Sequence, residues 1–574
     1  MKRNSCLNHI FRLIWNHTLQ VWVAVAETTA SSGKAGATQR RVAAAALLAL
    51  GGNAVLAGPG GGQVTAGSGS ISMAGGVTTV RQTSATLNLG WQSFNVGATD
   101  TVNFIQPSAS AVAVNRVLGN DGSQILGRIN ANGQVWLINP NGILFGRDAQ
   151  VNVGGLVAST LDMADSAVGS GTARFAGNSR ASVLNLGQIT AADGGSVALL
   201  GHSVTNTGSI SARLGTVALG AGSAATLTFD GSSLLSLRID DSALNALADN
   251  GGLLRADGGQ VLMSAGARNA LLASVVNNTG VVQARTVEQR EGSIVLLGGM
   301  AAGTTQVEGR LDASAPDGGN GGFIETSAAK VHVSDSARVT TLAAQGQAGI
   351  WLIDPTDFTV AVSGGDMTGA AVASALAGGG FSIQSSSGVS GTGGNVNIND
   401  ALAWSANGLT LNAAANINLN AALTGTGTAS LALQYGQGAV AASNTAKYNV
   451  NAPVTLPAGS HFSTQLGSNG SVVSYTVITS LGLAGSSTGT DLQGMAGGLS
   501  GNYALGADID ASTTAAWNSG AGFAPVGDSA TPFLGTLAGL GHRISGLTIN
   551  RPTTDYVGLF GQSATTAPPS ARLT

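Results

Sequence analysis

The sequence predicts an all-β protein, a right-handed parallel β-helix (solenoid) with short extrahelical hairpins and helices. Three observations predict this class. The chain has 86 glycines in 574 residues, with 9% charged and 4% aromatic residues, so many small layers suit it better than one thick aromatic core. Its hydrophobic content of 43% is too high for a disordered coil. Short alternating strands also recur at a nearly constant spacing, with glycines beside them.

The repeating unit consists of two short strands, each introduced by a glycine. The first strand begins at Gly187 and again at Gly208, and the second begins at Gly195 and again at Gly215. The unit returns more loosely at Gly252 with Gly259, at Gly280 with Gly292, and at Gly309 with Gly322. Each coil of a parallel β-helix exposes strand edges that the next coil pairs, so this repeat predicts stacked coils.

The N-terminus carries two predicted targeting segments, residues 1–33 and 34–57. Residues 34–57 combine a basic region, an apolar run and a small-residue cleavage site between Ala57 and Gly58, which is typical of a signal peptide. The order of residues in 8–27 is similar to the extended signal-peptide region of very large secreted Gram-negative proteins. This order of residues favours an extended signal-peptide region over a short amphipathic helix.

Loss of residues 1–57 changes the charge and the cysteine content. It removes six basic residues and one acidic residue, which leaves 19 basic and 27 acidic residues and a net charge of −8. A chain of this charge without basic patches is not expected to bind nucleic acid. The single cysteine, Cys6, also leaves with the signal. A mature chain without disulfides suits a protein that crosses the oxidising periplasm unfolded.

An unusual turn follows an apolar strand that we predict over residues 135–138. The turn consists of Asn139, Pro140, Asn141 and Gly142, in which proline fixes one φ angle and glycine supplies a positive one. A second apolar strand begins at Ile143. Because Asn-Gly between two hydrophobic runs is also an ordinary hairpin signal, a plain tight turn is the alternative.

Together with residues 91–96, 115–119 and 151–160, this turn resembles the haemagglutination-activity segment of filamentous haemagglutinins. Those proteins are the large secreted partners of bacterial two-partner secretion systems. The resemblance covers residues 60–180 closely. It implies export by the Sec machinery, recognition by the POTRA domains of a cognate outer-membrane β-barrel transporter, passage unfolded, and folding outside a Gram-negative cell.

The resemblance also implies which residues the transporter recognises: Asn115, Arg116, Asn139, Pro140, Asn141, Gly142 and Ile143. The alternative is that the same residues matter chiefly for folding the first coils. The expected output is adhesion by a secreted or surface-exposed monomer to a host-cell glycan or protein receptor. No cofactor is expected.

We expect soft domain limits in such a stack. Residues 58–335 are the predicted secretion domain, 336–500 continue the β-helix, and 501–574 resemble a Gly-rich repeat of haemagglutinin-like adhesins. Such repeats normally occur in series, and no cap follows this one, so we expect a truncated product.

Excursions from the coil are predicted at two places. Residues 242–251 and 368–378 each begin at a capping residue and end at glycine, which is typical of a short helix. A strand is expected over 381–383. Alternating asparagines in 395–399 recur in 416–420, one repeat further along the chain, and predict outward ladders between coils.

Signals for catalysis are weak, so no enzyme activity, catalytic residue or metal site is expected. The four histidines of the mature chain, at positions 202, 332, 461 and 542, lack metal-ligand spacing. Asp354 and Asp357 could pair as in a β-helix polysaccharide lyase, but a turn and a cap explain them better. The alternative to an adhesin is the delivery stalk of a contact-dependent toxin or a haemolysin, whose compact, charged C-terminal domain is not found in residues 500–574.

Overall fold

The computed structural model describes residues 11–16, 21–26, 58–169, 171–229, 234–266, 275–386 and 393–563. The chain forms two units, Met1–Leu56 and Ala57–Thr574. In the first unit, β1 (Phe11–Asn16) and β2 (Val21–Ala26) pair antiparallel. The predicted signal core at 34–57, including Ala57, lies outside the described residues.

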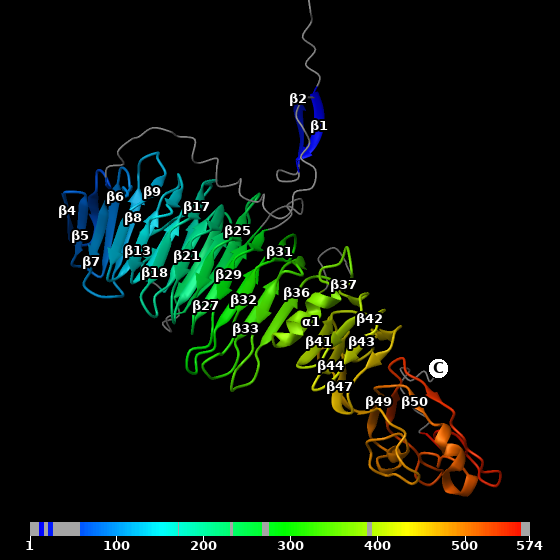
Figure 1. The fold of residues 1–574 in the computed structure, drawn as a ribbon. Helices are drawn as coiled ribbons and strands as arrows, with labels where there is room; N and C mark the ends of the chain where they lie inside the picture. The colour runs from blue at the N-terminus through cyan, green and yellow to red at the C-terminus, as the bar shows by residue number, and fades with distance from the viewer. Residues whose placement is uncertain are drawn as a thin grey trace, which may run out of the picture. The chain divides into compact units, whose positions relative to one another are not determined.

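The second unit is a stack of coils in which each coil contributes one strand to each of three sheets (Figure 1). The first sheet contains β3 (Gln63–Ala66), β6 (Thr86–Trp91), β8 (Val112–Val117), β11 (Gln134–Ile138), β14 (Gly155–Ser159), β19 (Val197–Gly201), β22 (Thr216–Ala221), β27 (Gln260–Ala265), β30 (Ser293–Leu297), β33 (Phe323–Ser327), β36 (Ile350–Asp354), β38 (Gly380–Ser385), β41 (Gly408–Ala413), β44 (Ser430–Tyr435), β47 (Gly459–Leu466), β48 (Val473–Ile478), β49 (Asn502–Leu505) and β51 (Thr536–Ala538).

The second sheet contains β4 (Gly69–Ala74), β5 (Val77–Gln82), β7 (Thr101–Ile105), β10 (Arg128–Ala131), β13 (Gln150–Val153), β18 (Gln188–Ala191), β21 (Ser209–Ser211), β26 (Leu253–Arg255), β29 (Val281–Gln283), β32 (Arg310–Asp312) and β35 (Arg338–Thr340). The third contains β9 (Ser123–Ile125), β12 (Ile143–Phe145), β17 (Ser182–Asn185), β20 (Ser203–Asn206), β25 (Leu247–Asn250), β28 (Val276–Asn278), β31 (Thr304–Val307) and β34 (Lys330–Val333).

The second and third sheets end at β35 and β34, and in later coils two smaller parallel sheets take their place. One contains β37 (Phe358–Val360), β39 (Val396–Ile398), β42 (Ile417–Leu419) and β45 (Tyr448–Val450), and the other β40 (Leu402–Trp404), β43 (Leu423–Gly425) and β46 (Val454–Thr455). Near the end, β50 (Ile509–Asp510) pairs with β52 (Ile544–Ser545) over a separate small core. No described helix is long and apolar enough to cross a membrane.

The strand pairings confirm the predicted parallel β-helix and its register. Gln188 lies opposite Ser209, and Val197 opposite Val217, so each strand pairs with its equivalent one repeat further along the chain. Within one coil, Val183, Ile189 and Val197 from the three sheets point inward and are fully buried. The core is therefore a column of small aliphatic layers, as the composition predicts.

The repeat glycines stand at two corners of the coil, where successive backbones nearly touch. A Cβ on Gly215 would lie 1.8 Å from the carbonyl oxygen of Gly195, and one on Gly208 would lie 2.1 Å from that of Gly187. Neither glycine has a positive φ angle. Close approach of the backbones, rather than turn conformation, therefore requires glycine at these corners.

The two predicted excursions have different outcomes. Residues 368–378 contain α1 (Gly369–Ala377), whose N-cap Thr368 accepts a hydrogen bond from the Ala371 amide, so this helix is confirmed. The predicted helix over 242–251 is wrong, because these residues form a turn at Leu244 and Asn245 followed by β25. Pairing of β25 with β20 and β28 buries Ala248, which outweighs the local helical preference.

Amide side chains form ladders both outside and inside the stack. The predicted outer ladder is confirmed, because Asn418 donates to Asn397 and Asn449 to Asn418, each at 2.8 Å. An inner ladder was not predicted. Its fully buried members bond in sequence at 2.7–2.8 Å: Asn185, Asn206, Asn250 and Asn278. Each precedes a corner glycine by two positions, a pattern visible in the sequence.

Candidate functional site

The Asn-Pro-Asn-Gly turn is a corner between two sheets, not a hairpin. It joins β11 of the first sheet to β12 of the third, and these two strands are paired with strands of other coils rather than with each other. The Gly142 amide donates to the Asn139 carbonyl at 3.1 Å, and Gly142 has a φ of 111°. The positive φ explains the glycine, as the sequence predicts.

Asn139 is fully buried and satisfies its amide group within the fold. Its Nδ2 donates to the Asp121 carbonyl at 3.0 Å and to Ser123 Oγ at 2.9 Å. Its Oδ1 accepts from the Asn141 backbone amide at 2.9 Å. The side chain thus ties the corner to the preceding coil, and in the folded domain it does not reach the surface.

The exposed part of the turn is Pro140 and Asn141. Asn141 Nδ2 donates to the Gly119 carbonyl at 2.9 Å, and Ser179 Oγ donates to the Pro140 carbonyl. Ile143, the next predicted site residue, packs into the core with 2% of its surface exposed. Of the turn residues, Pro140 and Asn141 therefore offer the most surface to another molecule.

Asn115 and Arg116 lie on β8 and face opposite ways. Asn115 is fully buried, accepts from Trp91 Nε1 at 3.0 Å and donates to the Trp136 carbonyl at 3.3 Å, so it links three successive coils. Arg116 faces outward, and its guanidinium donates to Asp162 Oδ1 and the Met163 carbonyl and pairs with Asp165. It anchors an extrahelical element to the coil.

That element is a four-stranded antiparallel sheet laid over the outer face of the first sheet. It contains β15 (Asp162–Met163), β16 (Thr172–Ala176), β23 (Ala224–Phe229) and β24 (Leu235–Asp241). Its Phe175 and Phe229 contact Trp136, with ring centroids 6.0 and 5.9 Å apart. The sequence analysis did not predict this extrahelical sheet. The unbroken apolar run of β11 indicates it, because such a strand needs burial on both faces.

Asp354 and Asp357 each bond to a group on a neighbouring coil rather than to one another. Asp357 accepts from the Asn395 amide at 2.8 Å, a bond to the neighbouring coil rather than a local helix or turn cap, while Asp354 accepts from Gln384 Nε2 at 3.1 Å. Burial raises the pKa of Asp354, and the neighbouring Glu325 carboxylate adds to the rise. Among the described residues, no group of three histidine, cysteine, aspartate or glutamate side chains could hold a metal ion.

We expect Asp354→Asn to stabilise the coil by about 1 kcal/mol at neutral pH. Asp354 Oδ1 is buried without a hydrogen-bond partner among the described residues, and the raised pKa means that folding disfavours the charged carboxylate. The gain should disappear as the pH falls through the raised pKa towards the ordinary value of 3.8, because protonation then removes the same penalty. Hydrogen exchange of β36 against pH measures it. The exposed control Asp121→Asn should change nothing, and a destabilised Asp354→Asn protein would refute the expectation.

A buried carboxylate forms a charge network across the second sheet. The side chain of Asp312 is fully buried, and its Oδ2 lies 2.8 Å from guanidinium nitrogens of Arg285 and Arg310. Its Oδ1 accepts from the Ser314 hydroxyl at 2.6 Å. Burial alone would raise the pKa of Asp312, but the bonds from Ser314 and the two arginines outweigh it and hold the pKa below its ordinary value.

Comparison with known proteins gives two family matches. A model described as the extended signal peptide of type V secretion systems matches residues 8–57, and one described as the TPS secretion domain matches residues 56–312. The described β-helix includes most of the second match, and its corner turn at residues 139–142 lies within it.

Individual relatives match part of the chain. A heme/hemopexin-binding protein of Haemophilus influenzae is 36% identical over 238 residues, which are 40% of this chain and 26% of that protein. Halomucin of Haloquadratum walsbyi is 52% identical over 68 residues, 11% of this chain and 1% of that protein. The crystal structure of the HMW1 secretion domain from Haemophilus influenzae is 24% identical with a TM-score of 0.49, over 71% of this chain and 100% of that domain.

An export signal followed by a secretion domain defines the class: exoproteins of type V secretion, which leave by the Sec route and then cross the outer membrane. Within that class, the match of residues 56–312 identifies a two-partner secretion domain, which implies export through a cognate outer-membrane transporter. The resemblance found in the sequence is confirmed to this extent. The chain spans about a quarter of the length of the Haemophilus relatives that it matches.

Proposed function

We propose that the mature protein is an adhesin-like exoprotein that acts as a monomer on a host-cell glycan or protein receptor. The observation that supports this is the continuation of the stack past the secretion domain. From β33 to β47 the first sheet runs on without a break, and the neighbouring sheet of β39, β42 and β45 presents uncharged amide ladders on its outer face. Such a continuous, polar face gives an exported chain a surface to present.

Recognition for export belongs to the same proposal. POTRA domains of the transporter bind the N-terminal coils, with Asn115, Arg116 and residues 139–143 as the recognition elements. The chain then crosses unfolded and folds outside, where each closing coil buries apolar surface worth roughly 25 cal/mol per Å². This supplies a driving force that needs no nucleotide in the periplasm.

Expression together with the cognate transporter in a non-adherent bacterial strain tests the adhesive role. We expect cells that secrete the full mature chain to attach to epithelial cells, while cells that secrete residues 58–335 alone do not. Secretion is measured in the same cultures by immunoblot of the medium and the cell surface. Normal secretion of the full chain without attachment would reject adhesion and leave the export assignment intact.

A comparison of Asn139→Ala with Asn141→Ala separates folding from recognition. Asn139→Ala removes buried bonds to Asp121 and Ser123, so we expect it to lower stability by about 2 kcal/mol, with slower secretion. Asn141 is exposed, so Asn141→Ala should leave thermal unfolding of the purified chain nearly unchanged. A loss of secretion by this variant would therefore report recognition. Unimpaired secretion by both variants would remove the turn from the recognition elements.

A further inference from the structure

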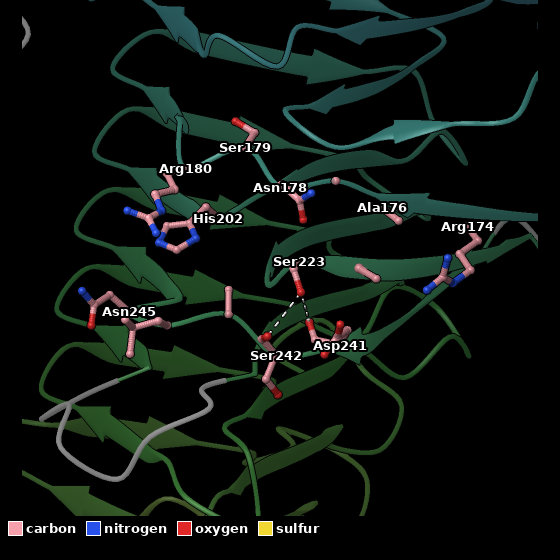
Figure 2. Close-up of a pocket in the computed structure, with 14 residues that line it drawn as sticks. Arg174, Ala176, Asn178, Ser179, Arg180, His202, Ser223, Asp241, Ser242 and Asn245 are labelled. Atoms are coloured by element: carbon pink, nitrogen blue, oxygen red, sulfur yellow. Dashed lines mark hydrogen bonds between the residues drawn. The ribbon is translucent and has the colours of Figure 1, made fainter.

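A groove with charged side chains in its walls lies where the extrahelical sheet meets the coil, beside the contact that Ser179 makes with the Asn-Pro-Asn-Gly corner. Its volume is about 590 Å³. Figure 2 shows its two ends, with Arg180 and His202 side by side at one end and Arg174 at the other. The walls come from β16 and the segment after it, from His202 just before β20, from the start of β23, and from the end of β24 with the turn that follows.

The end of the groove formed by Arg180 and His202 carries the positive charge of Arg180 and lacks a matching carboxylate among the described residues. Neither side chain makes an ion pair with a described acidic residue, whereas Arg174 at the far end has Asp240 at 3.5 Å. Asp241 also lines the groove but is engaged in interactions of its own. The mature chain has a net charge of −8, so a concave site with unpaired positive charge is unusual on it and would attract an acidic ligand.

The remaining walls suit a peptide. Asn178 is exposed and presents an amide donor and acceptor side by side, as a peptide backbone requires. Leu244 at the rim is 55% exposed and offers apolar contact to a side chain of the ligand. The segment is also fixed in place, because the Gly177 amide donates to the Ser223 carbonyl at 3.0 Å and Ser179 bonds to Pro140.

We propose that this groove binds an acidic peptide segment of a partner protein, with a carboxylate held between Arg180 and His202. An arginine fork and an imidazolium are the groups that bind a carboxylate through charge-assisted hydrogen bonds. The assignment names the chemistry of a surface partner, so it rests on the proposed adhesive role for its biological meaning. Binding itself is measured in solution, without secretion or attachment.

Binding of the peptide should depend on pH in a defined direction. Burial lowers the pKa of His202, and the adjacent Arg180 lowers it further, so the free groove holds a neutral imidazole at neutral pH. A bound carboxylate stabilises the protonated ring, so binding takes up a proton and tightens as the pH falls from 7.5 to 5.5. Glutamate side chains with an ordinary pKa of about 4.3 stay ionised over this range. Of the charged residues that line the groove, Arg180 lies beside the ring, and Arg174 and Asp241 line the rest of it.

Fluorescence anisotropy with a labelled hexaglutamate peptide and purified mature chain tests the proposal. We expect the wild type to bind this peptide but not its glutamine counterpart. Arg180→Gln should weaken binding about tenfold, the loss of one charge-assisted contact. His202→Gln should remove the gain at low pH. Arg147→Gln, which removes an exposed charge outside the groove, should bind like the wild type.

Each other outcome overturns a stated part of the proposal. Absence of glutamate-peptide binding by the wild type would reject the site, as would an equal loss in Arg147→Gln, which would mean general charge attraction. Tighter binding of dextran sulfate than of the peptide, with the same sensitivity to Arg180→Gln, would make a sulfated glycan the occupant and reject the peptide. A failure of cell attachment with peptide binding intact would reject adhesion alone.

Discussion

Replacing Gly215 by alanine is expected to prevent β22 from stacking on β19. The added methyl group would lie 1.8 Å from the Gly195 carbonyl oxygen, which is backbone and cannot swing aside. We expect a destabilisation of about 3 kcal/mol, the upper end for overpacking, concentrated in the adjoining coils. Because long repeat stacks do not unfold in a single step, hydrogen exchange of β19 and β22 is the appropriate measurement.

Gly539→Ala provides the control for this prediction. Gly539 has an ordinary φ angle, and the nearest atom to an added Cβ would be the His542 carbonyl oxygen at 3.9 Å. Its exchange rates should match the wild type. Unchanged protection of β19 and β22 in Gly215→Ala would show that the coils can separate at this corner, contrary to our account of the repeat glycines.

The second large effect is expected from Asp312→Asn. The neutral amide cannot serve both guanidinium groups and the Ser314 hydroxyl as the carboxylate does, so we expect a loss of about 3 kcal/mol. The pKa of Asp312 is lowered in the fold, so the charged form contributes stability at neutral pH. That contribution is lost as the pH falls below the ordinary value of 3.8 and through the lowered one, and the difference between variant and wild type should shrink with it.

Hydrogen exchange of β29 and β32 between pH 3 and pH 7 measures this difference. The matched control is Asp193→Asn, which breaks the ion pair with Arg213 in which both side chains are about half exposed. Exposed pairs contribute little, so this variant should stay within about 1 kcal/mol of the wild type at every pH. A loss in Asp312→Asn that does not vary with pH would point to packing rather than charge.

The stack itself was predictable because its signal is periodic. The regular spacing of equivalent glycines specifies which strands pair, and Gln188 opposite Ser209 follows directly. The outer asparagine ladder was predictable for the same reason. The turn at Leu244 was not, because residues 242–251 carry local helical signals and only the neighbouring strands β20 and β28 make them a strand.

The candidate site was predictable as a list of residues but not as a geometry. Nothing local in the sequence shows that Asn115 and Asn139 are fully buried while Asn141 is exposed, since all three are polar. Arg116 pairs with Asp162 and Asp165, which lie far along the chain, in β15 of the extrahelical sheet and in the short 3-10 helix after it. Long-range contacts of this kind leave no periodic trace. The groove around Arg180 depends on the same sheet and was missed for the same reason.

The corner glycines have a consequence for how such proteins diversify. The step from Gly195 to Gly215 is one plain coil, but the step from Gly215 to Gly259 is more than twice as long, and the surplus includes the hairpin of β23 and β24. Both steps end in the same backbone contact, at 1.8 and 2.0 Å for an added Cβ. Inserted residues therefore form elements outside the coil and leave the stacking of successive coils unchanged. Engineered insertions after β22 should be tolerated as the natural one is, so new decorations could evolve while the exported scaffold stays constant.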